Sequence, residues 1–328
     1  MEAATTRGVQ TFRPQLLERR ARLQEASASV SAAYIHDLIA EVDAALARVD
    51  SGSFGLCETC HDTIEVDRLE RNPLVRFCLD HLTGAEREAH EQDLELAAQI
   101  QFQLLPPRDI AAEKWDTHYR YEPLGAVGGD YCELIAARGT ESLFFAVGDV
   151  AGKGVAASLL MTHLSAIFRS LLSLDLTFAD VVSRANRLFC ESTAPAHYAT
   201  LVCGRATADA VELCNAGHCW PLLLRRGTTQ RLDSTGLPLG LFSGAQYAVH
   251  RLSLDAGDSL VLYSDGITEA QDPRGNEYGD DRLIRALWDC HGQAAEAMAD
   301  SVLRDVARFR EGRAPGDDMT LLVLRRRS

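Results

Sequence analysis

The chain has 328 residues, of which 46% are hydrophobic, enough for one large globular domain and a small one. Its 33 basic and 47 acidic residues give a formal net charge of -14, which argues against direct binding to nucleic acid, since such binding relies on Lys and Arg. No apolar run approaches the roughly 18 residues of a transmembrane helix and the start has no signal-peptide core, so we expect a cytoplasmic protein with no membrane partner.

Residues 14–50 are rich in Ala, Glu, Arg and Leu, and their apolar residues recur at steps of three and four. The recurring positions are Ile35, Leu38, Val42, Leu46 and Val49. This spacing predicts an amphipathic helix, most simply a helical hairpin that packs on itself or on a second copy. The stretch DSGSFG at 50–55 then ends the helix, so we expect a helical segment over 1–55.

Residues 56–82 carry Cys57-x2-Cys60 and, after seventeen residues, Cys78-x2-His81. Nine cysteines without a secretion signal indicate reduced thiols instead of a disulfide framework. Thiolates and imidazole at this spacing are typical of a closed tetrahedral site, so we predict one structural Zn²⁺ bound by these four side chains. Because the module is too short for a core of its own, the ion would supply much of its folding energy.

The stretches RVDSGSFGLCETC and RLERNPLVRFCLDH resemble the TraR/DksA zinc finger with its preceding helix. That family usually has Cys as the fourth ligand and Gly after the first pair. This chain has His81 and His61 at those positions, which makes His61 a rival ligand. The acidic D-x-x-D-x-A tip that such proteins direct at RNA polymerase is missing. The resemblance therefore implies a structural or regulatory interaction module.

Residues 83–107 predict a linker helix, which Pro106 and Pro107 close. Its apolar positions are Leu96, Ala97, Ile100, Leu104 and Leu105. They suit a dimer seam, which would give a homodimer through 84–105. They suit packing onto the following domain equally well, and the sequence does not separate the two.

From about residue 115, short apolar runs bounded by turn residues predict strands, the clearest being SLFFAVGDV, YATLVCGRA, AVELCNAG, WPLLLRR, DSLVLYSDG and MTLLVLRR. Helical stretches fall near 154–172, 178–190, 280–290 and 293–310. Many adjacent strands with helices inserted in pairs predict an α+β domain over 108–328, in which antiparallel sheets are covered by helical layers.

Aspartates occupy one kind of position in this domain, the end of an apolar strand beside a glycine or a turn. They are Asp130 after Gly128-Gly129, Asp149 at the end of FFAVGD, Asp265 at the end of LVLYSD, and Asp317 and Asp318 at the start of DDMTLLVL. One such aspartate is most simply a turn residue. Several together favour a centre for hard divalent cations, because these ions prefer clustered carboxylate oxygens.

Two other phosphate chemistries fit the sequence less well. Gly154 follows Lys153 where a P-loop needs Ser or Thr, and position 157 is Ala where a dinucleotide loop needs a third glycine. Cys132 and Arg138 have the C-x5-R spacing of cysteine-dependent phosphatases, but the residues between them predict a strand instead of a phosphate-binding loop. We therefore treat that match as coincidence.

Six motifs occur in the order found in the SpoIIE/RsbU branch of the PPM-type metal-dependent Ser/Thr phosphatases: VGGDY, GDVAGKGVAASLLM, NAGHCWPLLL, TGLPLGL, LVLYSDGITEA and GDDMTLLV. The chain resembles this family over roughly residues 100–326. The resemblance implies an α-β-β-α sandwich with two Mn²⁺ or Mg²⁺ ions at one end. The ligands that it implies are Asp130, Asp149, the Val150 carbonyl, Asp265 and Asp317, with Asp318 ranked lower because relatives often have Asn there.

The resemblance also implies the chemistry, hydrolysis of phosphoserine or phosphothreonine by water activated between two metals, without a phosphoenzyme. Relatives act on phosphorylated anti-sigma-factor antagonists of the STAS class in partner-switching pathways, so such a protein is the expected substrate. Ala151 stands where the eukaryotic branch has the His that protonates the leaving group, so the general acid is unassigned. The alternative is a zinc regulator that binds RNA polymerase or another partner and has an idle phosphatase domain, against which the complete aspartate set argues.

Overall fold

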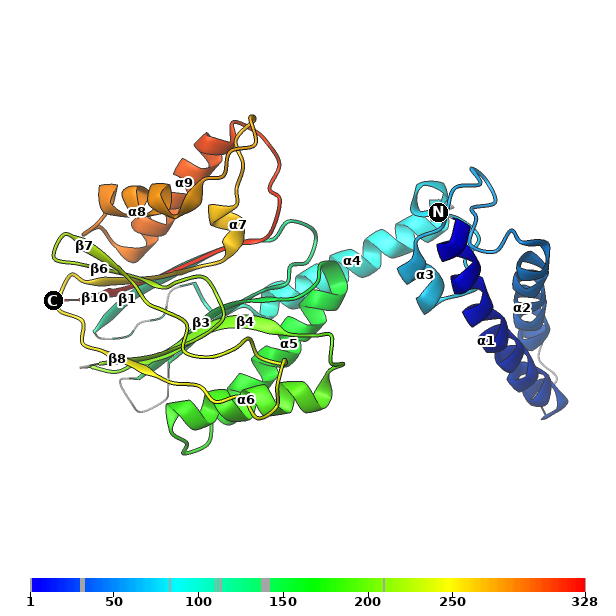
Figure 1. Ribbon diagram of the computed structural model, residues 1–328, viewed down its shortest axis with the longest axis horizontal. Coiled ribbons are helices and arrows are strands. Elements are labelled where there is room, and N and C mark those ends of the chain that lie inside the picture. The colour runs from blue at the N-terminus through cyan, green and yellow to red at the C-terminus, as the bar shows by residue number, and fades with distance from the viewer. Residues whose placement is uncertain are drawn as a thin grey trace. The chain divides into compact units, whose positions relative to one another are not determined.

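The computed structural model describes residues 2–29, 33–82, 84–108, 110, 112, 114–136, 142–208 and 210–327. The chain divides into two compact units, Met1–Gln92 and Asp93–Ser328. Helix α4 (Gly84–Leu104) begins in the first unit and ends in the second (Figure 1).

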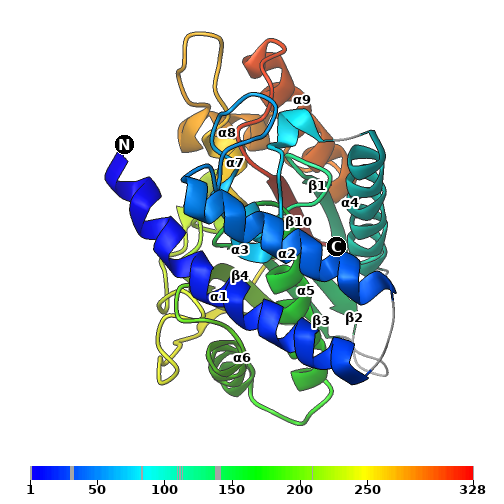
Figure 2. The same ribbon diagram turned by 90° about the vertical axis from the view of Figure 1, so that its right-hand side faces the viewer.

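The first unit contains a helical hairpin followed by the cysteine module. Helices α1 (Glu2–Ser29) and α2 (Ala33–Ser51) lie side by side and antiparallel (Figure 2), and ion pairs join Arg13 to Asp50 and Arg20 to Asp43. The hairpin is present as the periodicity predicts, although α1 begins well before residue 14. The cysteine module adds the short helices α3 (Val66–Arg71) and η1 (Leu79–His81).

The cysteine module shares a core with the hairpin. Phe54, Ile64 and Leu69 are buried in one cluster with Leu16 and Val42 of the two helices. The module is too short for a core of its own, as expected, and apolar burial against α1 and α2 stabilises it in addition to any bound ion.

The second unit contains two five-stranded antiparallel sheets. In spatial order, the first sheet consists of β1 (Trp115–Glu122), β10 (Met319–Arg326), β9 (Ser259–Tyr263), β6 (Leu222–Arg225) and β7 (Thr228–Arg231). The second consists of β2 (Asp130–Ala136), β3 (Leu143–Val150), β4 (Ala199–Ala206), β5 (Val211–Ala216) and β8 (His250–Leu252).

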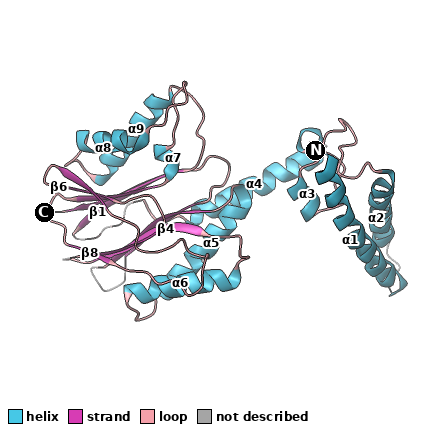
Figure 3. Ribbon diagram, in the orientation of Figure 1, coloured by secondary structure: helices cyan, strands magenta, loops and turns pink. Residues whose placement is uncertain are grey.

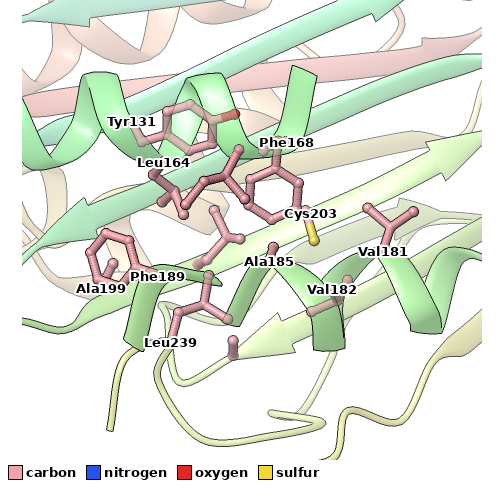
Figure 4. Close-up of a cluster of buried hydrophobic side chains, with 14 of the residues drawn as sticks. Tyr131, Leu164, Phe168, Val181, Val182, Ala185, Phe189, Ala199, Cys203 and Leu239 are labelled. Carbon is pink, nitrogen blue, oxygen red and sulfur yellow. The ribbon is translucent and has the colours of Figure 1, made fainter. Parts of the chain in front are cut away.

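Helices cover the outer face of each sheet, as Figure 3 shows. Helices α5 (Gly154–Leu171) and α6 (Phe178–Ser192) pack on the β2–β8 sheet, and α8 (Gly279–Asp289) and α9 (Ala295–Arg310) pack on the other. In Figure 4, Phe168 of α5 and Phe189 of α6 point into the same apolar cluster as Tyr131 of β2. The predicted α-β-β-α sandwich is confirmed.

Side chains of β3 point alternately into two buried layers, which explains why its sequence is almost entirely apolar. Phe144 and Ala146 face the helices α5 and α6, whereas Phe145 and Val147 face the opposite sheet. Successive side chains of a strand point to opposite faces, so a strand covered on both sides buries every residue.

Among the described residues one helix, α5, is long and apolar enough to cross a membrane by length and composition alone, and 44% of that stretch is buried within the structure. The core helix of a globular domain passes the same test. Because Met161, Leu164 and Phe168 pack against the sheet, we interpret α5 as such a core helix.

Candidate metal centre

Strand pairing and side-chain contacts bring the predicted aspartates together at one place between the two sheets. Asp130 begins β2 and pairs directly with Asp149 near the end of β3. Thr320 of β10 donates a hydrogen bond to Asp130 Oδ2 at 2.5 Å, which joins the second sheet to the first. Asp265 opens α7 (Asp265–Thr268) directly after β9, and Asp317 lies just before β10.

The carboxyl groups at this place are buried or partly buried, and they repel one another. Burial raises the pKa of Asp130 well above its usual range. Burial, together with the charges of Asp265 and Asp317, raises the pKa of Asp149 to about 7. The pKa of Asp265 is also raised, first by burial and then by Asp317. Ionised carboxylates in such surroundings are stabilised by a bound cation.

The Gly-Lys-Gly turn supplies one positive charge to this cluster. Lys153 Nζ lies 3.0 Å from Asp317 Oδ2. Gly152 and Gly154 flank it with φ angles of 123° and 67°, which favour glycine. The structure shows an exposed lysine whose ammonium group balances part of the acidic charge.

The arrangement of oxygens fits hard divalent cations. A Cβ atom on Gly129 would lie 3.3 Å from the Val150 carbonyl oxygen and 3.6 Å from Asp149 Oδ1, so glycine keeps the space between these oxygens open. Carboxylates and a backbone carbonyl are the donors that Mg²⁺ and Mn²⁺ prefer. Among the described residues, no three of these aspartates have ligand atoms that all lie within 4.8 Å of one another.

Asp318 has a different setting from the other aspartates. Its Oδ1 accepts a hydrogen bond from the Leu124 N–H at 2.6 Å. Its Oδ2 accepts hydrogen bonds from the Gly129 N–H at 2.6 Å and the Asp130 N–H at 3.4 Å. Both oxygens are thus engaged with the backbone of residues 124–130, which we call the metal loop. Asp318 holds this loop, and Asp130 and Asp149 lie beside it.

Sequence reasoning missed three polar side chains that support the aspartates. Thr320 and Ser264 are fully buried, and the Ser264 hydroxyl accepts a hydrogen bond from the Thr320 N–H at 2.9 Å. The sequence could have indicated Thr320, because residues two apart in an extended strand point to the same face and Thr320 follows Asp318 by two. Gln101 of α4 contacts Gly128 through its carboxamide, and nothing in the apolar pattern of that helix indicates it.

The cysteine module brings together Cys57, Cys60, Cys78 and His81, whose ligand atoms all lie within 4.8 Å of one another. The Cys60 and Cys78 sulfurs are 3.7 Å apart, and Cys78 Sγ lies 3.3 Å from His81 Nδ1. Two sulfurs bound about 2.3 Å from a tetrahedral zinc ion lie about 3.8 Å apart, so the donors fit zinc. The rival His61 is exposed and has a φ angle of 60°, the left-handed conformation that favours glycine.

The pKa values of the two thiols of the first cysteine pair shift in opposite directions. Burial alone would raise the pKa of the Cys57 thiol, but backbone N–H groups of Cys60 and Cys78 outweigh it and lower that pKa. A backbone hydrogen bond from Asp62 lowers the pKa of Cys60, but burial and the hydrogen bonds with Cys57 and Cys78 outweigh it, so that pKa is raised. A thiolate is the form that binds a metal.

Comparison with known proteins assigns the larger unit. The family model described as Stage II sporulation protein E (SpoIIE) matches residues 139–327. The chain belongs to the SpoIIE family. The model of the prokaryotic dksA/traR C4-type zinc finger matches residues 52–80, and His81 lies just beyond that match. Both resemblances inferred from the motifs are confirmed.

The SpoIIE-family chain has distant relatives along most of its length. It is 26% identical to the phosphoserine phosphatase RsbU of Bacillus subtilis over 250 residues, which cover 75% of this chain and 73% of RsbU. It is 27% identical to protein IcfG of Synechocystis over 268 residues, which cover 71% of this chain but only 41% of IcfG.

Two solved structures share its fold. The SiaA-PP2C domain of Pseudomonas aeruginosa has a TM-score of 0.65 at 20% identity, covering 74% of this chain and 98% of that one. The catalytic domain of the phosphatase PstP, solved with two manganese ions, has a TM-score of 0.52 at 14% identity, covering 66% and 99%. At these identities the likeness shows the fold alone.

The surroundings of His218 and Cys132 in this SpoIIE-family domain favour structural roles for both side chains. His218 Nδ1 lies 2.8 Å from the Thr200 hydroxyl, and burial lowers the pKa of His218 to about 4, so the ring is neutral near pH 7 and supports β4. Cys132 is buried in the apolar layer between the sheets, and this burial raises the pKa of its thiol well above the usual range. Arg138, its partner in the C-x5-R spacing, lies outside the described residues.

Proposed function

We propose that this chain is a metal-dependent protein phosphatase that hydrolyses phosphoserine or phosphothreonine. The observation that carries the proposal is the convergence of four buried or partly buried carboxylates, Asp130, Asp149, Asp265 and Asp317, beside the Val150 carbonyl. Two bound Mn²⁺ or Mg²⁺ ions would supply an activated water and stabilise charge on the transferring phosphoryl group. The activity for which RsbU is named supports the same assignment.

The chain's own residues hold these ligands in place. The Thr320 hydroxyl donates a hydrogen bond to Asp130 Oδ2 and so helps to hold this carboxylate in place. Asp318 holds the backbone of Gly129, and the direct pairing of Asp130 with Asp149 keeps these two carboxylates adjacent. Preorganised ligands of this kind need no rearrangement during the reaction.

A cleft of about 390 Å³ beside the aspartates suits a phosphorylated side chain. Lys153, Gly266, Glu269, Arg313 and Asp317 are among the residues that line it. Lys153 and Arg313 present two cations at its surface, and such groups bind phosphoryl oxygens through charge-assisted hydrogen bonds. Ala151 offers no proton donor at the start of the turn, so we assign the general acid to no side chain.

We further propose that the substrate is a phosphorylated antagonist of the STAS class and that the cysteine module binds one structural Zn²⁺. The phosphoserine phosphatase activity for which RsbU is named supports a phosphorylated substrate, and the STAS class is what the motif resemblance implies. The thiol and imidazole cluster supports the second. The module with its helical hairpin would then serve as the sensing or docking element of the phosphatase.

One experiment tests the assignment. The metal content of the purified chain is measured, and phosphate release from a phosphorylated STAS protein and from a phosphoserine peptide is followed with and without Mn²⁺. Release that requires Mn²⁺ and fails in Asp265→Asn is expected. A chain that binds RNA polymerase stoichiometrically and releases no phosphate from either substrate would instead be the zinc regulator with an idle domain.

A further inference from the structure

Two side chains hold the metal loop. Asp318 lies next to β10 of the sandwich, whereas Gln101 belongs to α4. We propose that Gln101 is a positioning residue that couples the last turn of α4 to divalent metal binding, by fixing the backbone at Gly128. The inference rests on the proposed function, since the ions concerned are those bound by Asp130 and its neighbours.

The environment of Gln101 differs from that of its neighbours on α4. Its side chain is buried and 5% exposed, whereas Gln99 and Gln103 are exposed. Burying a carboxamide is costly unless each polar end finds a partner. Here both ends meet one residue, because Nε2 donates to the Gly128 carbonyl at 2.7 Å and Oε1 accepts from the Gly128 N–H at 3.0 Å.

A two-point contact of this kind fixes both the position and the rotation of a backbone segment. The next residue along the loop, Gly129, donates its N–H to Asp318, and Asp130 follows it at the metal centre. A rotation at Gly128 would therefore turn the Gly129 and Asp130 peptides with it. Groups that orient metal ligands from outside typically change metal affinity when they are removed.

The loop cannot be held from within by a side chain at position 128. A Cβ atom there would lie 2.4 Å from Tyr121 Oη and 2.7 Å from Asp318 Oδ2. Position 128 must remain glycine, and a glycine has no side chain to restrain its own backbone. The restraint is supplied by Gln101 instead.

The end of α4 also contacts the sandwich at other points, since Leu105 packs against the apolar cluster between the sheets. Arg169 of α5 donates to the Leu104 carbonyl at 3.2 Å, and Tyr119 of β1 donates to the Pro106 carbonyl at 2.7 Å. Gln101 adds the contact that reaches the metal loop. Coupling between two sites is reciprocal, so metal binding should also stabilise this turn of the helix.

The test compares Gln101→Leu with Gln103→Leu in the full-length protein. Both variants make the same substitution on the same helix, but only the first removes the contacts to Gly128. The dissociation constant for Mn²⁺ alone is measured by calorimetry, without substrate. We expect binding to weaken by about 10- to 100-fold in Gln101→Leu and to change less than about twofold in Gln103→Leu, where no contact to the loop is lost.

A second readout separates positioning from loss of fold. In Gln101→Leu, raised Mn²⁺ should restore kcat, whereas a partly unfolded enzyme would keep a reduced kcat at any concentration. Mn²⁺ should also slow amide hydrogen exchange over residues 98–105 in the wild type and in Gln103→Leu, but not in Gln101→Leu. If Gln101→Leu does not fold, Gln101→Asn replaces it, since this shorter amide cannot reach both Gly128 atoms and should weaken Mn²⁺ binding in the same way.

The outcomes distinguish this inference from the proposed function. Equal Mn²⁺ affinity of the wild type and the folded Gln101 variant would overturn the inference and leave the phosphatase assignment intact. A wild type that binds no Mn²⁺ at the aspartates and releases no phosphate would overturn both.

Discussion

Replacing Asp318 with alanine should strongly destabilise the sandwich. The carboxylate is 8% exposed and accepts hydrogen bonds from the backbone N–H groups of Leu124, Gly129 and Asp130. In Asp318→Ala these donors lose their acceptor inside the protein.

The size of the effect follows from the geometry. The two contacts at 2.6 Å are short hydrogen bonds to a charged group, and the third, at 3.4 Å, is weak. Bonds to charged groups contribute about 1.5–3 kcal/mol each, so the loss should be roughly 3–6 kcal/mol. The stability of a domain is about 5–15 kcal/mol, so the variant should fold but be marginal. Asp318→Asn keeps one acceptor oxygen and should lose roughly half as much.

Asp317→Ala is the matched control. Its side chain is 44% exposed and pairs with the exposed Lys153. Exposed ion pairs contribute about 0–1 kcal/mol, so this variant should unfold nearly as the wild type does, although it removes a proposed metal ligand.

Urea unfolding followed by tryptophan fluorescence measures the difference. All three tryptophans, Trp115, Trp220 and Trp288, lie in the unit Asp93–Ser328, so the signal reports the sandwich alone. The measurement is made without added Mn²⁺ and compares free energies by linear extrapolation. A loss below about 1 kcal/mol in Asp318→Ala, or equal losses in Asp317→Ala and Asp318→Ala, would refute the reasoning.

Three further predictions concern other parts of the chain. Asp149→Asn should abolish Mn²⁺-dependent phosphate release while elemental analysis still finds one zinc per chain, and unchanged release would contradict the metal assignment. Ile100 is 51% exposed on α4, so Ile100→Asp should convert a homodimer formed through 84–105 into a monomer, and an unchanged mass by light scattering would exclude that seam. The Arg282 guanidinium lowers the pKa of Asp305 below 3.8, so this pair stabilises the fold above that pH and the contribution is lost as the pH falls through the folded-state pKa. The difference in urea midpoint between the wild type and Asp305→Asn should therefore be constant above about pH 5 and shrink as the pH falls further, and a difference that stays constant below about pH 5 would contradict this prediction.

The sequence predicted best the strands that are buried on both faces. The run MTLLVLRR coincides with β10, which lies between β1 and β9 and has six consecutive buried residues. It missed β1, β7 and β8, each of which ends a sheet. The sequences WDTHYRYE, TTQR and HRL are largely polar, and such edge strands take their conformation from the neighbouring strand instead of an apolar pattern of their own.

Within the candidate site, too, the residues with a local sequence signal were predicted and those that depend on tertiary packing were not. The aspartates could be found because each stands in a recognisable local position, at the end of an apolar strand beside glycine. Thr320 and Asp130 are 190 residues apart in the sequence and meet only when the two sheets pack. The spacing favoured His81 but left His61 as a rival, and only the folded geometry, which groups the His81 ring with the three thiols, separates the two.

The two restraints on the metal loop differ in how easily they can be released. Asp318 precedes β10, which is hydrogen-bonded to a strand on each side, so the backbone at Asp318 can move away from the loop only if the sheet is disrupted. Gln101 lies on the last turn of a helix whose side chains at 96, 100 and 102 are more than half exposed. Moving that turn by a few ångströms would break two hydrogen bonds, each with a net contribution of about 1 kcal/mol, and leave the sandwich folded. A change in α4 of this size is therefore sufficient to alter metal affinity, whereas a change that reaches the loop through β10 would cost much of the stability of the domain.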